Sequence, residues 1–245
     1  DVVTACSTEG ATLALSDEDR AKSDMAYGNI ALSIATYEAS PEVNAFSSKY
    51  DLTYTGKVKL TKQERRGFAL FRGKGMCHRC HISNDTEALF TDYTFDNLGT
   101  PKNPDNPVYD NHPDFVDSGL GGFLKNAGYP EDVYMAEWGK QKVPTLRNVD
   151  LRPAEDFVKA YGHNGYFKSL EGIVHFYNTR DVKPSCESLG ILDATEEDAL
   201  ANDCWPEPEV TDNVNTEELG NLGLTPEEEA AIVAFMKALS DGYQP

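Results

Sequence analysis

Residues 77–81 read Cys77-His78-Arg79-Cys80-His81, and this pentapeptide decides how the chain is interpreted. C-x-x-C-H is the attachment signature of c-type haem: two thiols add to the vinyl groups, and the following histidine lies beneath the iron. We therefore expect one covalently bound haem c per chain, held by Cys77 and Cys80, with His81 as the proximal iron ligand.

Two other kinds of site use paired cysteines, and neither fits the surrounding sequence. A zinc site needs a second Cys/His pair, and His112, His163 and His175 do not repeat ligand spacing. A thioredoxin-like dithiol has a strand before it, whereas the sequence before Cys77 predicts a helix. The haem interpretation remains.

Composition limits the class of protein further. The chain has 245 residues, and 22 Lys+Arg against 41 Asp+Glu give a formal charge of −19. That charge repels nucleic acid and anionic lipid and attracts basic proteins. No run of about 18 apolar residues occurs, so we expect no membrane span. Haem attachment takes place outside the bacterial inner membrane, and the start at Asp1 lacks a signal peptide, so we expect a processed, periplasmic or otherwise exported protein.

Periodicity and capping residues predict four helices. Ser16 caps an amphipathic helix over 16–40, with Ile30, Ile34 and Tyr37 on one side. Capping boxes at Thr61 and Thr225 open helices over about 61–75 and 225–240, which should pack together, and another helix begins at Ser169. We expect a mainly α fold: a helical segment over residues 1–56 packed on a cytochrome c-like haem domain over residues 57–245.

Long irregular segments separate these helices. Residues 82–143 are rich in Asn, Asp, Pro and Gly and should be mostly loop, organised by the apolar face of the haem. Cys186 and Cys204 lie in an acidic, turn-rich segment, close enough in sequence for a disulfide. Cys6 is then left as an unpaired terminal thiol. It has either no role or a role in joining the chain to another subunit.

Several ordered motifs resemble the bacterial di-haem cytochrome c peroxidase and MauG family. They are Lys-Val-Pro-Thr-Leu-Arg-Asn-Val over 142–149, Ala-Tyr-Gly-His-Asn-Gly over 160–165, Lys-Ser-Leu-Glu over 168–171, Phe-Asp-Asn-Leu-Gly over 95–99 and Leu-Thr-Pro-Glu-Glu over 224–228. The similarity extends over roughly residues 25–240. It implies the carboxy-terminal haem domain of that family, the half through which electrons enter, preceded by one helix.

Two departures from the family pattern bear on function. The family has two C-x-x-C-H motifs and this chain has one, so peroxide reduction does not follow from the resemblance alone. Family members usually read Tyr-Met-His where this chain reads Tyr161-Gly162-His163, and the resemblance makes that Met an iron ligand. Glycine has no ligand atom, so the sixth coordination position must be filled otherwise or stay open.

Three options remain for that position. Met135 lies in a flexible segment before residue 142, and thioether ligation would give a high-potential electron carrier. His163 could rotate into the sixth coordination position, because Gly162 and Gly165 give its loop conformational freedom. Open or water-bound iron would suit peroxide or a diatomic ligand. The other methionines are set aside because two fall on apolar helix faces and one adjoins the haem motif: Met25, Met236 and Met76.

The expected function is electron transfer through one covalently bound haem c, with a basic redox protein as partner. Arg147 is expected to contact a haem propionate, because a buried carboxylate needs a cationic partner. The alternative is a haem peroxidase or oxidase acting on hydrogen peroxide at an open distal site, with His163 as acid or base. Association of the chain with further copies of itself, as a homo-oligomer, is another option.

Overall fold

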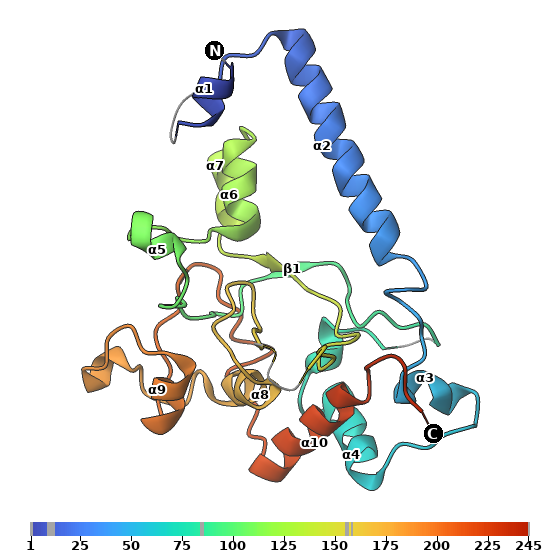
Figure 1. Cartoon of the computed structure of the whole chain (residues 1–245). Helices are drawn as coiled ribbons and strands as arrows, with labels where there is room; N and C mark the ends of the chain where they lie inside the picture. Colours follow the sequence, from blue (N-terminus) through green and yellow to red (C-terminus); the bar gives the residue numbers. More distant parts are fainter. Residues whose placement is uncertain (1, 9–12, 84–85, 155–156, 158, 245) are drawn as a thin grey trace. The chain divides into compact units, whose positions relative to one another are not determined.

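The computed structural model describes residues 2–8, 13–83, 86–154, 157 and 159–244. The chain forms two compact units, Asp1–Phe46 and Ser47–Pro245. It is mainly helical, with 41% helix, which confirms the expected fold class (Figure 1). The α-helices are α1 (Val2–Cys6), α2 (Asp17–Glu38), α3 (Lys49–Tyr54), α4 (Lys62–Arg72), α5 (Val108–Asn111), α6 (Gly119–Asn126), α7 (Glu131–Ala136), α8 (Leu170–Thr179), α9 (Glu196–Ala201) and α10 (Pro226–Lys237).

Helix α2 dominates the first unit. The Ser16 hydroxyl accepts a hydrogen bond from the Asp19 backbone N–H at 3.1 Å, so the predicted N-cap is confirmed. The expected single apolar side is wrong. Ile30 is 60% exposed, and Leu32, more than half a turn away around the helix, is 66% exposed. Met25, expected on a packed helix face, is exposed as well.

The second unit begins ten residues before the expected division between residues 56 and 57, because α3 belongs to its core. Tyr50 is buried, and its ring lies 5.6 Å from that of Phe68 and 5.8 Å from that of Phe235. Ser48 caps α3 with a capping box that includes Asp51. Aromatic packing therefore joins α3 to α4 and α10.

Helices α4 and α10 lie against each other, as the sequence predicts (Figure 1). Both predicted capping boxes are present, at Thr61 and at Thr225. Gly67 allows the close approach, because a Cβ atom there would lie 1.8 Å from the carbonyl oxygen of Ala231. The rings of Phe71 and Phe235, both fully buried, meet at 5.3 Å.

Residues 82–143 contain more regular structure than expected. Strands β1 (Phe95–Asp96) and β2 (Gln141–Lys142) pair antiparallel. Helices α6 and α7 lie between them in sequence and contact each other. The run of glycines at the start of α6 reads as a loop, but it is a packing surface: a Cβ atom at Gly121 would lie 2.5 Å from the Cα atom of Trp138. Only a residue without a side chain fits there.

The acidic segment after α8 is closed by a disulfide between Cys186 and Cys204, which confirms that expectation. Both cysteines are fully buried, beside the buried ring of Trp205. Cys6 is an exposed free thiol. None of the helices in the described part of the chain has both the length and the apolar character needed to cross a bilayer.

Candidate functional site

A cavity of about 400 Å³ lies in the second unit, and we call it the main cavity. Helices α4, α8 and α10 contribute Phe71, Val174 and Ile232 to its lining. Loop residues within 96–100, 139–149, 160–163 and 215–219 also line it. Its volume falls within the range of pockets that hold small molecules and cofactors. Cys77, Cys80 and His81 all face this space.

A tight turn delivers the C-x-x-C-H motif to the main cavity. After α4 ends at Arg72, Met76 adopts a left-handed conformation with φ of 56°, and Cys77–Arg79 form a 3₁₀ turn. The backbone N–H of His81 donates to the Cys77 carbonyl at 2.9 Å. The motif is therefore a compact loop that places the two thiols and the imidazole on one cavity.

A backbone contact orients the His81 ring. Its Nδ1 lies 2.8 Å from the carbonyl oxygen of Phe90. A hydrogen bond to that carbonyl places the proton on Nδ1 and leaves the Nε2 lone pair available, which is the usual arrangement of a metal-binding histidine. Burial also lowers the pKa of His81, which favours the neutral imidazole.

The two thiols are reduced and partly buried. Burial raises the pKa of both Cys77 and Cys80 to about 12, so both are protonated at neutral pH. Nearby carboxylates, of which Glu218 and Asp96 have the largest effects, add to the shift at Cys80. The arrangement offers two thiols for covalent attachment at one edge of the main cavity.

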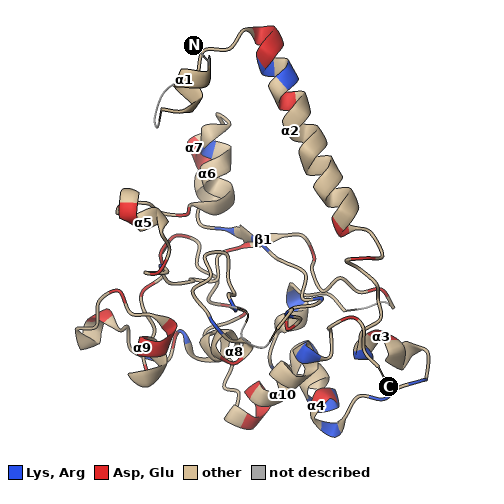
Figure 2. Cartoon of the chain, viewed as in Figure 1, with Lys and Arg blue, Asp and Glu red and all other residues tan. Residues whose placement is uncertain are grey.

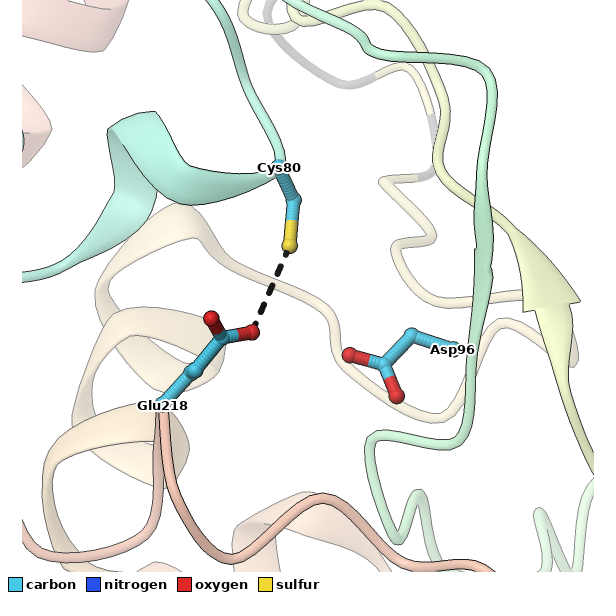
Figure 3. Close-up of side chains that lie close together, drawn as sticks. All are labelled: Cys80, Asp96 and Glu218. Carbon is cyan, nitrogen blue, oxygen red and sulfur yellow. Dashed lines mark hydrogen bonds between the residues drawn. The ribbon is translucent and has the colours of Figure 1, made fainter.

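A polar cluster borders the main cavity beside Cys80. Figure 3 shows the side chains of Cys80, Asp96 and Glu218 directed toward one another, with the Cys80 thiol 3.8 Å from Glu218 Oε2. Asn215 Nδ2 donates to Asp96 at 2.6 Å and to Glu218 at 3.0 Å. The sequence does not predict this cluster, because its members come from three segments far apart in the chain.

The Tyr161-Gly162-His163 loop forms part of the wall of the main cavity. Tyr161 exchanges backbone hydrogen bonds with Phe167, and Gly162 has φ of 79°. The Tyr161 hydroxyl is buried without a hydrogen-bond partner among the described residues. Buried hydroxyls normally have hydrogen-bond partners, so this hydroxyl is placed to form a hydrogen bond with a bound group.

The structure separates the two candidates for the sixth coordination position. Met135 is 37% exposed on α7 and does not line the main cavity. His163 does line it, and its Nε2 lies 3.7 Å from Glu209 Oε2 and 3.9 Å from Asp117 Oδ2. Two methionines set aside from the sequence, Met76 and Met236, also line the main cavity. Their positions in the sequence, Met76 beside the motif and Met236 on a helix, do not reveal that they line this cavity.

Arg147 is not among the residues that line the main cavity, although its neighbour Leu146 is. Its guanidinium donates to Asp51 Oδ2 at 2.7 Å and to Asp241 Oδ1 at 2.9 Å, and its side chain is 1% exposed. A bidentate pair with Asp51 uses donors that a propionate would need. Contact between Arg147 and a haem propionate stays a prediction, without support from this arrangement.

His175 connects two helices. Its Nδ1 lies 3.0 Å from Glu229 Oε1 of α10, and its Nε2 lies 2.6 Å from Lys183 Nζ. An ammonium only donates, so Nε2 accepts in this contact. The contact with Glu229 joins α8 to α10.

The residues on the main cavity fit a c-type haem. The chemistry of the donor set matches, with two protonated thiols and one imidazole whose Nε2 is available, and the rest of the lining is mostly apolar. The unpartnered Tyr161 hydroxyl is consistent with a group that is held against it.

Comparisons with known proteins agree with this interpretation. No protein-family model matches the chain. MauG, a methylamine utilization protein of Paracoccus denitrificans, is 31% identical over 230 residues, which cover 91% of this chain and 54% of that protein. The cytochrome-c peroxidase IdrP1 of Denitromonas iodatirespirans is 27% identical over 224 residues, covering 84% of this chain and 48% of the relative.

Solved structures give the same result. The di-haem peroxidase BthA of Burkholderia thailandensis matches with a TM-score of 0.62 at 31% identity, over 83% of this chain and 48% of BthA. The present chain spans about half the length of the relatives it matches. It is homologous to MauG and the di-haem cytochrome c peroxidases over most of its length and corresponds to one domain of them.

Proposed function

We propose that this chain binds one haem c covalently and transfers electrons between that haem and a redox partner protein. The observation that carries the proposal is the convergence of Cys77, Cys80 and His81 on one apolar cavity. Cys77 and Cys80 would hold the vinyl edge, and His81 Nε2 would bind the iron. When bound, the haem supplies a one-electron couple in a site that the surrounding side chains keep largely dry.

Charge supports a basic partner and an encounter outside the inner membrane. The chain carries a formal charge of −19, and Figure 2 shows acidic residues on α9 and in the first turn of α10. Asp96 and Glu218 bring carboxylates to the cavity edge beside Cys80. Opposite charge accelerates encounter between redox proteins, and attachment through thioethers is compatible with a periplasmic protein.

The decisive test is the haem content of the purified protein. A pyridine haemochrome assay should give one haem per chain that resists acidic organic extraction. The double substitution Cys77→Ser with Cys80→Ser should release the haem to extraction, because no thioether can form. An extractable haem in the unmodified protein, or a content near two per chain, would overturn the proposal.

Salt dependence tests the partner. Charges that steer the encounter act over long range and are screened beyond roughly 8 to 10 Å at physiological ionic strength. The rate of electron transfer to a basic redox protein should therefore fall steeply as salt is added. A rate that does not change with salt, or an acidic partner that reacts equally fast, would contradict a charge-steered partner.

A second candidate function is peroxide reduction, and the wall residue Gly162 is the observation that favours it. Gly162 lines the main cavity and brings no ligand atom to the iron. His163 lies beside it as a group able to accept or donate a proton. A high-spin ferric spectrum, rapid cyanide binding and turnover of hydrogen peroxide would support this function. A six-coordinate low-spin spectrum without turnover would favour electron transfer.

A further inference from the structure

Phe90, whose carbonyl oxygen contacts His81 Nδ1, has an unusual backbone conformation. Its φ is 55°, in the left-handed region that a residue with a side chain enters only at an energetic cost. Such conformations persist where the surrounding structure enforces them, and they are frequent at functional positions. The contacts that hold Phe90 therefore also decide where its carbonyl points.

The side chain of Phe90 is one of its anchors. It is fully buried, and its ring lies 5.2 Å from that of Tyr50 on α3 and 6.1 Å from that of Phe71 on α4. Packing of the ring fixes where the residue lies. The peptide group that follows the ring can still rotate, so the direction of the carbonyl depends on the backbone at either side.

Two threonine hydroxyls hold that backbone, and we call Thr91 and Thr145 the threonine clamp. The Thr145 hydroxyl donates to the carbonyl oxygen of Leu89, the residue before Phe90. The Thr91 hydroxyl, directly after Phe90, donates to the carbonyl oxygen of Val143 at 2.7 Å. The two bonds run in opposite directions between residues 89–91 and 143–145, so a rotation or shift of either segment would break at least one of them.

The threonine clamp connects the orientation of His81 to the wall of the main cavity. Val143 and Thr145 are part of the lining of that cavity. Thr91 is not part of the lining, and it is buried. The clamp therefore ties the segment that orients the imidazole to the 139–149 loop of the same cavity.

A hydrogen bond at His81 Nδ1 affects an iron bound at Nε2. An acceptor at Nδ1 draws the proton away from the ring, which makes Nε2 a stronger electron donor. A stronger donor stabilises ferric iron more than ferrous iron, because the ferric ion carries the higher charge. The reduction potential of the haem therefore falls when this hydrogen bond is well aligned and rises when it is loosened.

We propose that Thr91 and Thr145 are positioning residues for the iron ligand. They hold the Phe90 carbonyl on His81 Nδ1 and thereby keep the reduction potential of the haem low. The inference rests on the proposed haem function, and it adds a role for two residues that do not bind the iron.

The test uses the intact haem protein and two measurements other than activity: the reduction potential, and the rate at which the His81 Nδ1 proton exchanges with solvent, followed by NMR. Exchange should be slow in the unmodified protein. Thr91→Val and Thr145→Val keep the shape of the side chain and remove the hydroxyl. Each should speed the exchange and shift the equilibrium with a redox mediator by up to about tenfold toward the reduced haem, which corresponds to about 59 mV for one electron.

Three further variants separate positioning from a merely structural role. Thr91→Ser and Thr145→Ser keep the hydroxyl and should retain the potential and the exchange rate of the unmodified protein. Thr195→Val is the matched control, because it removes the cap of α9, where the Thr195 hydroxyl donates to Asp198 at 2.7 Å, and Thr195 does not line the main cavity. It should lower stability and leave both measurements unchanged.

Four results would overturn the positioning role. One is fast exchange of the His81 Nδ1 proton in the unmodified protein, which needs no variant to observe. Another is an unchanged potential in both Thr91→Val and Thr145→Val. The third is a change confined to Thr145→Val, which would mean a direct effect at the cavity wall.

The fourth is an equal change in Thr195→Val, which would mean a general loss of stability. Absence of covalent haem from the unmodified protein would instead overturn the proposed function itself, and the haemochrome assay detects it separately.

Discussion

The main cavity has two walls that differ in how they are held. One wall is helical, formed by α4, α8 and α10, and the other consists of the loops over residues 96–100, 139–149 and 160–163. The helical wall is held by local capping and by a close helix pair. The loop wall is held by polar side chains that reach across long sequence separations. The comparison shows which of the two walls can be predicted from sequence patterns.

The helical wall is stabilised by contacts that a sequence pattern can reveal. Thr61 and Thr225 cap its helices through their neighbours three residues on. Buried rings of Phe71 and Phe235 fill the space between α4, α10 and the rest of the core. Both the caps and the apolar stripes follow from residues close together in the chain.

The loop wall depends on single polar residues. Arg147 joins the 144–149 loop to α3 through Asp51 and to the carboxy-terminal segment through Asp241. Asn97 donates to the carbonyl oxygens of Val210 at 3.0 Å and Asp212 at 2.8 Å. Each of these contacts spans more than 90 residues. We expect the loop wall to be more sensitive to polar substitutions than the helical wall.

The largest effect is expected at Arg147. Arg147→Ala leaves the buried carboxylate of Asp51 without its bidentate partner, and removing one member of a buried ion pair costs about 3–5 kcal/mol. Urea denaturation should show this loss. The control Arg79→Ala removes a 3.4 Å pair with Glu218, but the Arg79 side chain is 62% exposed, so it should cost about 1 kcal/mol or less. Equal losses in both would remove the distinction between buried and exposed pairs.

The helical wall should be broken by a single methyl group at Gly67. A Cβ atom there meets the Ala231 carbonyl oxygen, so Gly67→Ala should separate α4 from α10 and cost up to about 3 kcal/mol. Gly28→Ala on α2 is the matched control, because nothing lies within 4 Å of its Cβ position. It should stabilise its helix by about 0.5–1 kcal/mol. Thermal denaturation followed by circular dichroism should show opposite signs, and a neutral Gly67→Ala would contradict the close approach.

A smaller loss is expected at Asn97. Asn97→Ala removes donors from two carbonyl groups and an acceptor from the backbone N–H of Gly99, at a cost of about 2 kcal/mol. Asn202→Ala removes one exposed hydrogen bond, to the Asp198 carbonyl, and should change stability by less than about 0.5 kcal/mol. If both variants unfold at the same urea concentration, single buried amides do not hold the loop wall.

The smallest change in stability, but a large spectroscopic one, is expected at Gly162. Its φ of 79° makes any side chain cost about 1–2 kcal/mol, while a Cβ atom there would make only ordinary van der Waals contacts, the nearest with Phe167 Cδ2 at 3.5 Å. Gly162→Met should yield a low-spin haem of raised potential and, if the wild-type iron is open, abolish cyanide binding. Gly165→Met carries similar strain, with φ of 71°, outside the main cavity lining. Its spectrum should stay like that of the wild type, and the same spectral change in both would rule out ligation at residue 162.

Some features of this protein follow from the sequence alone. The C-x-x-C-H motif at 77–81 predicts the donor set that the main cavity brings together. Capping boxes predict the starts of α4 and α10, and the spacing of Cys186 and Cys204 suggests their disulfide. These signals are local, because a cap, a turn or a short disulfide loop involves residues near one another in the chain.

Other features required the tertiary structure. Contact between Arg147 and a propionate stays a prediction, and only the fold shows that Asp51 and Asp241 pair with this arginine. The glycine-rich sequence of α6 predicts a loop, but these glycines mark a close approach to the segment around Trp138. In both cases the deciding partner lies elsewhere in the fold, so the residue type alone is consistent with more than one role.

The sequence by itself therefore determined the C-x-x-C-H motif, the fold class and the two helices α4 and α10 of the helical wall. The tertiary structure alone brought Glu209 to His163 and Glu218 to Cys80, and it left Met135 outside the main cavity. The physical reason is the range of the interactions. Backbone periodicity and capping act over a few residues, whereas a buried charge or hydroxyl is satisfied by whichever group the fold places beside it.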